Sequence, residues 1–279
     1  IRPWPLPAEV ATTDLRAVAA DPGGGLWIGT EGHGVIRLEG ERVSRLTVAE
    51  GLPDDHVRAL VVAADGSLWI GTAGGLLARL DGGRFELVNL DHEALHSPIT
   101  VLSKLSDGTI LVGTHGAGVA AVRGTAVTRI DSSRGLSHDV VYAVLEDREG
   151  SLWVGTNGGG LNQLARTRFR VLDRRAGLPS DMVFPVLEDR LGALWIGSEG
   201  GGLARVGPTG TTVISAADGL ADDKVFALFE DHRGDLWVGT YGGGLNRLRE
   251  GRIETFTTAD GLPGDFVWAL AEDRAGRLW

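Results

Sequence analysis

The chain has 279 residues, of which 43% are hydrophobic and 23% charged, and its formal net charge is −10. This negative charge is spread through the sequence and excludes nucleic acid as an expected partner, because a phosphate backbone requires a basic stripe. There is no cysteine, which excludes disulfides and thiolate metal sites. No apolar run approaches the roughly 18 residues of a membrane helix and no signal peptide is recognisable, so we expect a soluble chain that meets a membrane only through segments outside it.

A 42-residue repeat orders the whole chain. Its marker is a tryptophan in a Leu-Trp-x-Gly-Thr setting, at Trp27, Trp69, Trp153, Trp195, Trp237 and Trp279, with Leu111 in its place in the third copy. A period this strict predicts one supersecondary unit copied in series, and hence a single domain over residues 1–279.

Each copy divides into four short runs separated by glycine-rich turns. In the copy at residues 225–257 the runs are apolar or alternating and too short for typical helices, which predicts four antiparallel strands. The first turn repeats as Asp-x-x-Gly and predicts a type I hairpin turn. The second turn is Gly-Gly-Gly in three copies, where glycine supplies positive φ without steric cost. Four-stranded units of this length predict an all-β fold, the β-propeller.

We expect seven blades with the last one incomplete, and six blades as the alternative. Residues 1–5 align with 43–47 and 253–257, the outer fourth strand, and their two prolines suit an edge strand. The chain then ends in strand two of the seventh copy and has no initiator methionine, so we expect it to be a fragment of a longer protein.

The repeat string is specific. Asp-x-x-Gly-x-Leu-Trp-Ile/Val-Gly-Thr/Ser-x-Gly-Gly-Gly-Leu opens the copies at residues 147–164, 189–206 and 231–248, and Gly-Leu-Pro-x-Asp stands at 51–55, 177–181 and 261–265. These strings resemble the two-component regulator propeller repeat over essentially the whole chain. Copy three departs most, at Ile110-Leu111 and at residues 93–97.

The resemblance implies the extracytoplasmic, periplasmic sensor region of a bacterial inner-membrane signalling protein. In that family a β-sandwich, a membrane helix and a histidine kinase or diguanylate cyclase often follow the propeller. None of those output domains is in this sequence, so they are expected partners within the same full-length chain, and kinase activity is not implied for this segment.

Residues present in every copy are expected to serve the blade. By that rule the Glu-Asp pairs, such as Glu146-Asp147 and Glu188-Asp189, are turn and edge residues and not paired catalytic carboxylates. An Asp column in the loops is expected to cap them, at Asp55, Asp139, Asp181, Asp223 and Asp265. The glycine runs are not nucleotide fingerprints, because no helix follows them to present its N-terminus to a phosphate.

Residues that vary between copies are the candidates for function. The second position of strand one runs Arg16, Arg58, Thr100, Tyr142, Phe184, Phe226 and Trp268. If these side chains reach the channel mouth, one arc is basic and the other aromatic, which suits a sugar that carries acid or sulfate groups. The alternative is that they pack between blades. Glu31, His115, Asn157, Glu199 and Tyr241 share the turn between strands two and three on the same face.

Histidine is distributed unevenly. His33, His56, His92, His96, His115 and His138 map to loops on that face within the first four blades, and only His232 maps to the opposite side. Imidazoles beside carboxylates can bind a divalent metal or act as acid and base. No His-x-His or spaced triad is present, so solvated loop histidines are the alternative.

We therefore expect a ligand-binding sensor propeller that is not itself an enzyme, with a small-molecule or oligosaccharide ligand and neither metal nor other cofactor. The predicted ligand-binding residues are Arg16, Arg58, His115, Tyr142, Phe184, Phe226, Tyr241 and Trp268. Two other functions stay open: a metal-dependent lyase of the kind that propellers sometimes carry, and a protein-interaction scaffold that docks a partner or forms a homodimer.

Overall fold

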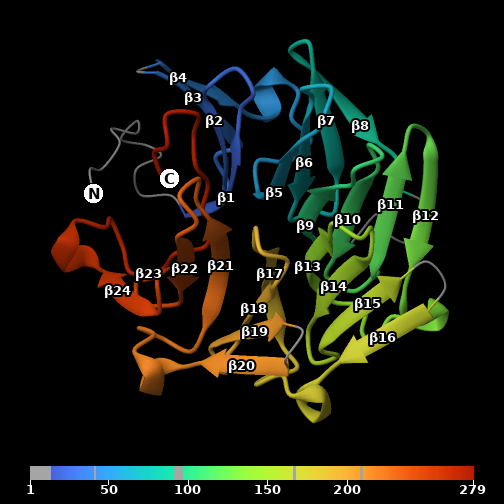
Figure 1. The fold of residues 1–279 in the computed structure, drawn as a ribbon. Helices are drawn as coiled ribbons and strands as arrows, with labels where there is room; N and C mark the ends of the chain where they lie inside the picture. Colours follow the sequence, from blue (N-terminus) through green and yellow to red (C-terminus); the bar gives the residue numbers. More distant parts are fainter. Residues whose placement is uncertain (1–13, 41, 91–96, 166–167, 208–209) are drawn as a thin grey trace. The chain divides into compact units, whose positions relative to one another are not determined.

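The computed structural model describes residues 14–40, 42–90, 97–165, 168–207 and 210–279. These residues form six four-stranded antiparallel sheets, in each of which the strands lie in chain order. Each sheet is one blade of a β-propeller (Figure 1). Within the described residues, no helix has the length and hydropathy needed to cross a membrane.

The first three blades consist of β1 (Leu15–Ala20), β2 (Leu26–Thr30), β3 (Val35–Glu39) and β4 (Arg42–Leu46); β5 (Val57–Val62), β6 (Leu68–Thr72), β7 (Leu77–Asp81) and β8 (Arg84–Val88); β9 (Ile99–Lys104), β10 (Ile110–Thr114), β11 (Val119–Arg123) and β12 (Ala126–Ile130). The next three consist of β13 (Val141–Glu146), β14 (Leu152–Thr156), β15 (Leu161–Ala165) and β16 (Arg168–Leu172); β17 (Val183–Glu188), β18 (Leu194–Ser198), β19 (Leu203–Gly207) and β20 (Gly210–Ile214); β21 (Val225–Glu230), β22 (Leu236–Thr240), β23 (Leu245–Arg249) and β24 (Arg252–Phe256).

The seven-blade prediction is not supported, and the described residues agree with the six-blade alternative. The seventh copy keeps the first turn, in which the Asp273 N–H donates to Arg277 O at 2.9 Å. Among the described residues, its strand pairing is limited to the isolated bridges Tyr241–Phe266 and Glu272–Leu278. Residues 1–5, the predicted outer strand, lie outside the described residues.

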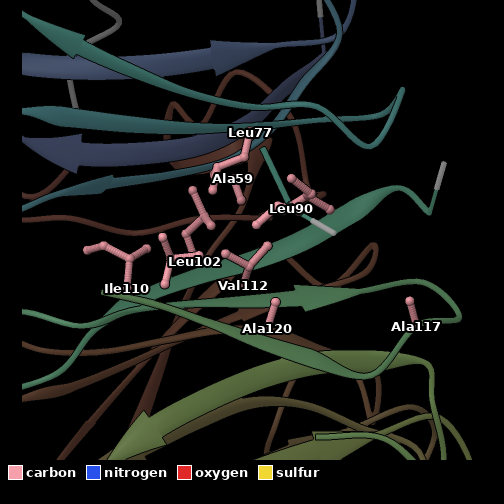
Figure 2. Close-up of a cluster of buried hydrophobic side chains, with 10 residues drawn as sticks. Ala59, Leu77, Leu90, Leu102, Ile110, Val112, Ala117 and Ala120 are labelled. Carbon is pink, nitrogen blue, oxygen red and sulfur yellow. The ribbon is translucent and has the colours of Figure 1, made fainter. Parts of the chain in front are cut away.

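The chain divides into two compact units, one built mainly of residues 5–144 and the other mainly of residues 145–272. The boundary falls within β13. In the first unit, a buried cluster fills the contact between blade β5–β8 and blade β9–β12, with Leu77, Leu102 and Val112 among its members (Figure 2). In the second unit, a cluster that includes Leu203, Val225 and Val238 joins blade β17–β20 to blade β21–β24.

The glycine of the Trp-x-Gly motif permits this blade-to-blade packing. A Cβ added at Gly71 would lie 2.4 Å from Ile99 Cγ2, and one at Gly239 would lie 2.7 Å from Val267 Cγ1. Both neighbours belong to the next copy, close to the start of its strand one. The motif glycine is therefore required by close approach, since real Cβ atoms do not come this near to other atoms.

The repeated aspartate and tryptophan are joined by a hydrogen bond in four copies. The Asp carboxylate accepts the indole Nε1–H at 2.7 Å for Trp153 and Asp147, 2.9 Å for Trp195 and Asp189, 2.9 Å for Trp237 and Asp231, and 3.0 Å for Trp279 and Asp273. Its other oxygen accepts N–H groups of the first turn, as from Ser151 to Asp147 at 2.7 Å. The Asp-x-x-Gly turn is thus confirmed, and one carboxylate both caps it and anchors the tryptophan.

Three copies depart from this arrangement. In the first copy the Asp21 carboxylate accepts from the Arg37 Nε at 2.9 Å instead of from the Trp27 indole. Ala63 stands in the aspartate position of the second copy, and the Nε1 of Trp69 is buried without a hydrogen-bond partner. In the third copy both members are replaced, by Leu105 and Leu111. Because Leu111 is buried at 1% exposure and carries no donor, it leaves no buried N–H unpaired.

The glutamate before the aspartate links neighbouring blades. Glu188 accepts the Arg148 N–H at 3.0 Å, and Glu230 accepts the Arg190 N–H at 2.8 Å and its Nε at 2.6 Å. Glu272 accepts from the N–H of His232 at 2.9 Å and pairs with its Nδ1. The Glu-Asp pairs are structural, as the sequence predicted, with the glutamate capping the first turn of the preceding copy.

The loop aspartates also cap, as predicted. Each accepts the first N–H of a short 3₁₀ turn seven residues earlier, for example from Val48 to Asp55 at 2.9 Å and from Thr258 to Asp265 at 2.7 Å. The Asp265 carbonyl in turn accepts the N–H groups of Gly242 and Gly244 in the second turn. The loop that carries each of these five aspartates is therefore fixed to the glycine turn of the blade before it.

Candidate functional site

The second position of strand one is the site of a β-bulge. Register shifts separate Leu15 from Ala17 in β1, Val57 from Ala59 in β5, and Val225 from Ala227 in β21. β9 and β17 shift register near the same position. A bulge leaves its residue unpaired and redirects the side chain. It is therefore the variable residue of each strand, such as Arg58 or Phe226, that leaves the ladder.

A second variable column, missed in the sequence, immediately precedes each strand one. It consists of Asp14, His56, Pro98, Val140, Met182, Lys224 and Phe266. The turn residue between strands two and three donates its N–H to the pre-strand residue of its own copy, as from Tyr241 to Lys224 at 3.0 Å. It also forms a β-bridge to the pre-strand residue of the next copy, as between Tyr241 and Phe266. Glu31, His115 and Tyr241 make both contacts, and each of them thus lies between two variable pre-strand residues.

In the 145–272 unit these columns bring five aromatic side chains together. We call Phe184, Phe226, Tyr241, Phe266 and Trp268 the aromatic cluster. The distances between ring centroids are 4.5 Å for Phe184–Phe226, 4.8 Å for Phe226–Trp268, 5.5 Å for Phe226–Tyr241, 5.6 Å for Tyr241–Trp268 and 4.7 Å for Tyr241–Phe266. These separations are those of favourable aromatic pairs. Four members are predicted site residues, and Phe266 is an addition.

The side chains of the aromatic cluster range from half-buried to exposed. Phe184, Phe226 and Trp268 are half-buried, whereas Tyr241 is 41% exposed and Phe266 is 55% exposed. The three strand-one rings therefore pack together, as the packing alternative expects. Tyr241 and Phe266, which meet edge to face at 73°, form its exposed edge.

A lysine lies at this exposed edge. The Nζ of Lys224 is 5.4 Å from the centroid of the Tyr241 ring, a distance typical of a cation–π contact. Its own backbone N–H donates to the Asp222 carboxylate at 2.7 Å. The exposed edge of the aromatic cluster therefore carries a positive charge, from a residue that is not among the predicted site residues.

In the 5–144 unit the predicted arginines meet carboxylates. Arg16 Nε donates to Glu31 at 3.0 Å and its terminal nitrogen lies 3.4 Å from the carboxylate of Asp14. Arg58 is 3.8 Å from the same Glu31 oxygen, and its side chain is 43% exposed. The basic pair is thus partly neutralised within the protein, and of the two Arg58 is the more available to an anion.

His56 lies beside this group. It forms a β-bridge with Glu31, and its Nδ1 is 3.0 Å from the Asp54 carboxylate. Burial raises the pKa of Asp54, but the hydrogen bonds that it accepts from His56 and from the Gly74 N–H outweigh burial and leave the pKa below its ordinary value. Asp54 is therefore an ionised anchor for the His56 loop.

The other predicted residues of this unit are Tyr142 and His115. The centroids of their rings are 6.3 Å apart and the ring planes meet at 67°, an edge-to-face arrangement. His115 is exposed. Thr100, at the same strand position as Tyr142, donates its hydroxyl to the Val141 carbonyl. This neighbourhood is less aromatic than the cluster in the 145–272 unit, and it contains an imidazole and a phenol.

The histidines do not assemble a metal site in the part of the chain that the structure describes. His33, His56, His115 and His138 lie in the loops that carry the variable columns, while His92 and His96 lie outside the described residues. Among the described side chains, no group of three or more His, Cys, Asp or Glu is arranged to hold a metal ion.

The family model of the two-component regulator propeller matches residues 51–74, 135–158, 219–242 and 261–279. No curated protein matches the chain by sequence.

Solved structures share the fold. The extracellular domain assigned to the hybrid two-component system BT3049 from B. thetaiotaomicron is 22% identical with a TM-score of 0.85, covering 95% of this chain and 37% of that one. The extracellular domain assigned to the one-component system BT4673 of the same organism is 19% identical with a TM-score of 0.50, covering 99% and 47%. The chain therefore spans less than half the length of either.

An inactive virginiamycin B lyase from Staphylococcus aureus, solved with quinupristin, is also similar in structure. It is 14% identical with a TM-score of 0.78, and the similarity covers 98% of this chain and 96% of that one. At these identities the likeness extends to the propeller fold and not to the chemistry of a site.

Proposed function

Because this chain carries two-component regulator propeller repeats, we propose that it is the ligand-binding sensor segment of a membrane-bound signalling protein and that it lies outside the cytoplasm, in the periplasm. Extracellular domains of bacterial signalling systems share its fold. The segment binds a ligand and does not transform it. The output domains of the full-length protein convert that binding into a signal.

The aromatic cluster is the observation that carries the proposal. Five rings from three consecutive copies lie in contact, and two of them, Tyr241 and Phe266, are exposed. Residues that serve the blade recur in every copy, and these do not. Exposed aromatic side chains in contact offer flat apolar area at low cost in side-chain entropy.

A carbohydrate is the ligand class that this surface suits best. A pyranose has an apolar face of C–H groups that stacks on an aromatic ring, and hydroxyl groups at its rim that need polar partners. Polar turn residues adjoin the cluster: Glu199 donates its N–H to Met182 O at 3.1 Å, and Asn157 forms a β-bridge with Met182. The other predicted ligand-binding residues, Arg16, Arg58, Tyr142 and His115, occupy the equivalent columns of the 5–144 unit.

Only the similarity of the fold supports the lyase alternative. The lyase structures resemble this chain at 14–15% identity, and the described histidines form no metal-binding group. A sensor segment could also form a homodimer through the exposed aromatic edge, and light scattering over a range of concentrations would measure it.

Thermal denaturation with a panel of neutral and acidic oligosaccharides tests the proposal. A ligand present at 100 times its Kd stabilises the folded state by about 2.7 kcal/mol, which is a shift of several degrees for a chain of this size. We expect at least one sugar to raise the Tm. The absence of a shift with every sugar at millimolar concentration would refute carbohydrate binding.

A further inference from the structure

The cation at the aromatic edge has no carboxylate partner. Within the described residues no Asp or Glu oxygen is within 4.0 Å of the Lys224 ammonium, whose recorded contact is the face of Tyr241. Some of the described arginines pair with carboxylates, for example Arg190 with Glu230 at 2.6 Å and Arg37 with Asp21 at 2.7 Å, whereas Lys224 contacts an aromatic face. Lys224 thus places a positive charge beside the exposed aromatic rings of a chain that has ten more negative than positive charges.

Backbone hydrogen bonds fix the position of Lys224. The Lys224 backbone N–H donates to the Asp222 carboxylate at 2.7 Å. The Lys224 carbonyl accepts the Tyr241 N–H at 3.0 Å, which fixes the lysine backbone beside the Tyr241 ring. The side chain is exposed, so its ammonium can meet a charged ligand group while the rings hold the apolar part.

Copy-to-copy variation marks Lys224 as a specific feature. At the same pre-strand position the neighbouring copies have Met182 and Phe266, which are apolar. Neither turn nor blade geometry calls for a lysine here, because the backbone contacts of this position are made in the other copies as well, as between Glu199 N–H and Met182 O. Lys224 therefore adds a charge and no structural function that the blade requires.

We propose that Lys224, with Tyr241 and Phe266, selects an anionic sugar, in which the pyranose ring stacks on the exposed aromatic edge and a carboxylate or sulfate group pairs with the ammonium. This inference rests on the proposed carbohydrate-binding function and adds the charge of the ligand. A charge-assisted hydrogen bond from an ammonium to an oxyanion is about twice as strong as a neutral one. Loss of the Lys224 ammonium is consequently expected to raise the Kd for an anionic sugar about tenfold.

Matched sugars separate charge from shape. Calorimetric titration with an oligogalacturonide, its methyl ester, a sulfated galacto-oligosaccharide and its desulfated form compares the same rings with and without the anion. We expect an acid or sulfated form to bind about tenfold more tightly than its neutral counterpart, and the preference to fall as salt is added. The pair that shows the preference identifies the anion as carboxylate or sulfate.

Variants assign the preference to the lysine. Lys224→Met keeps an unbranched side chain on Tyr241 and removes the charge, so it should bind charged and neutral forms alike, while Lys224→Arg should keep the preference. Unchanged Tm values for both variants show that the fold is intact.

The inference is overturned if neutral and charged forms bind the native chain equally, or if Lys224→Met retains the preference. Binding of neutral sugars only would leave the proposed function standing and overturn this inference. Failure of every sugar to bind would overturn both.

Discussion

Replacing Ala63 with aspartate should stabilise the protein, because it supplies the acceptor that Trp69 lacks. The backbone turn is already formed: the Ala63 N–H donates to Ser67 O at 2.9 Å and the Gly66 N–H to Ala63 O at 3.1 Å. The turn at Asp147 has the same pair of bonds, at 2.9 and 3.0 Å. A carboxylate at position 63 would therefore reach the Trp69 Nε1 as Asp147 reaches Trp153.

The expected gain is about 1 kcal/mol. A net hydrogen bond contributes roughly 0.5–1.5 kcal/mol, and a buried unpaired donor costs roughly 1–3 kcal/mol. Repulsion between the new carboxylate and Asp65 opposes this gain, since Asp65 already accepts the Ser67 N–H at 2.9 Å. The Arg79 guanidinium, 3.0 Å from Asp65, partly neutralises that charge. For a chain of this length, about 1 kcal/mol raises the Tm by roughly 2–4 °C.

Urea and thermal denaturation of Ala63→Asp measure the gain. The matched control is Ala64→Asp, which adds the same charge at the adjacent exposed position. A double-mutant cycle with Trp69→Phe isolates the indole contact, since the gain should vanish when Nε1 is absent. The reasoning is refuted if Ala63→Asp is no more stable than Ala64→Asp, or if its gain persists in the Trp69→Phe background.

Other consequences concern pH and close packing. Burial raises the pKa of Asp231, but hydrogen bonds from the Trp237 indole and from turn N–H groups outweigh it, so the pKa is below its usual 3.8. This carboxylate therefore contributes stability above about pH 4 that is lost as the pH falls through its lowered pKa, and Asp231→Ala should flatten the loss in acid denaturation curves. Gly71→Ala would place a methyl group 2.4 Å from Ile99 and should cost about 2–4 kcal/mol in urea denaturation. Gly264→Ala, where an added Cβ meets nothing within 4 Å, should be nearly neutral, and equal costs for the two glycines would contradict the packing argument.

Much of the blade could be predicted from the sequence because its signals are local. The Asp-x-x-Gly turn depends on four consecutive residues, and the cap at Asp55 on a spacing of seven. The bond between Asp147 and Trp153 spans only six residues, yet the sequence did not reveal it, because it depends on the twist of the hairpin. The unpaired Nε1 of Trp69 follows from that bond and was hidden with it.

Residues from different copies were harder to place. The bulge at strand position two redirects Phe226 and its equivalents, and periodicity assigns a residue to a position without showing such a redirection. Phe266 and Lys224 were not predicted, because they lie in the pre-strand column and neither at strand position two nor in the glycine turn. The 42-residue alignment would have found them, since the pre-strand column varies as much as the two columns that were compared. The blade number was mispredicted by counting the partial seventh copy as a blade, although its described residues form bridges without a ladder.

The central claim is that the exposed aromatic edge binds a sugar, and calorimetric titration of Phe266→Ala tests it most directly. Phe266 is 55% exposed, so its loss should lower the Tm by no more than a few degrees, whereas loss of a stacking ring should weaken sugar binding about tenfold or more. Leu191→Ala removes an apolar side chain that is 82% exposed on the first turn of its copy, at the other end of the strands, and should bind the sugar as the native chain does. Equal affinities of the native chain and Phe266→Ala for that sugar would contradict the account.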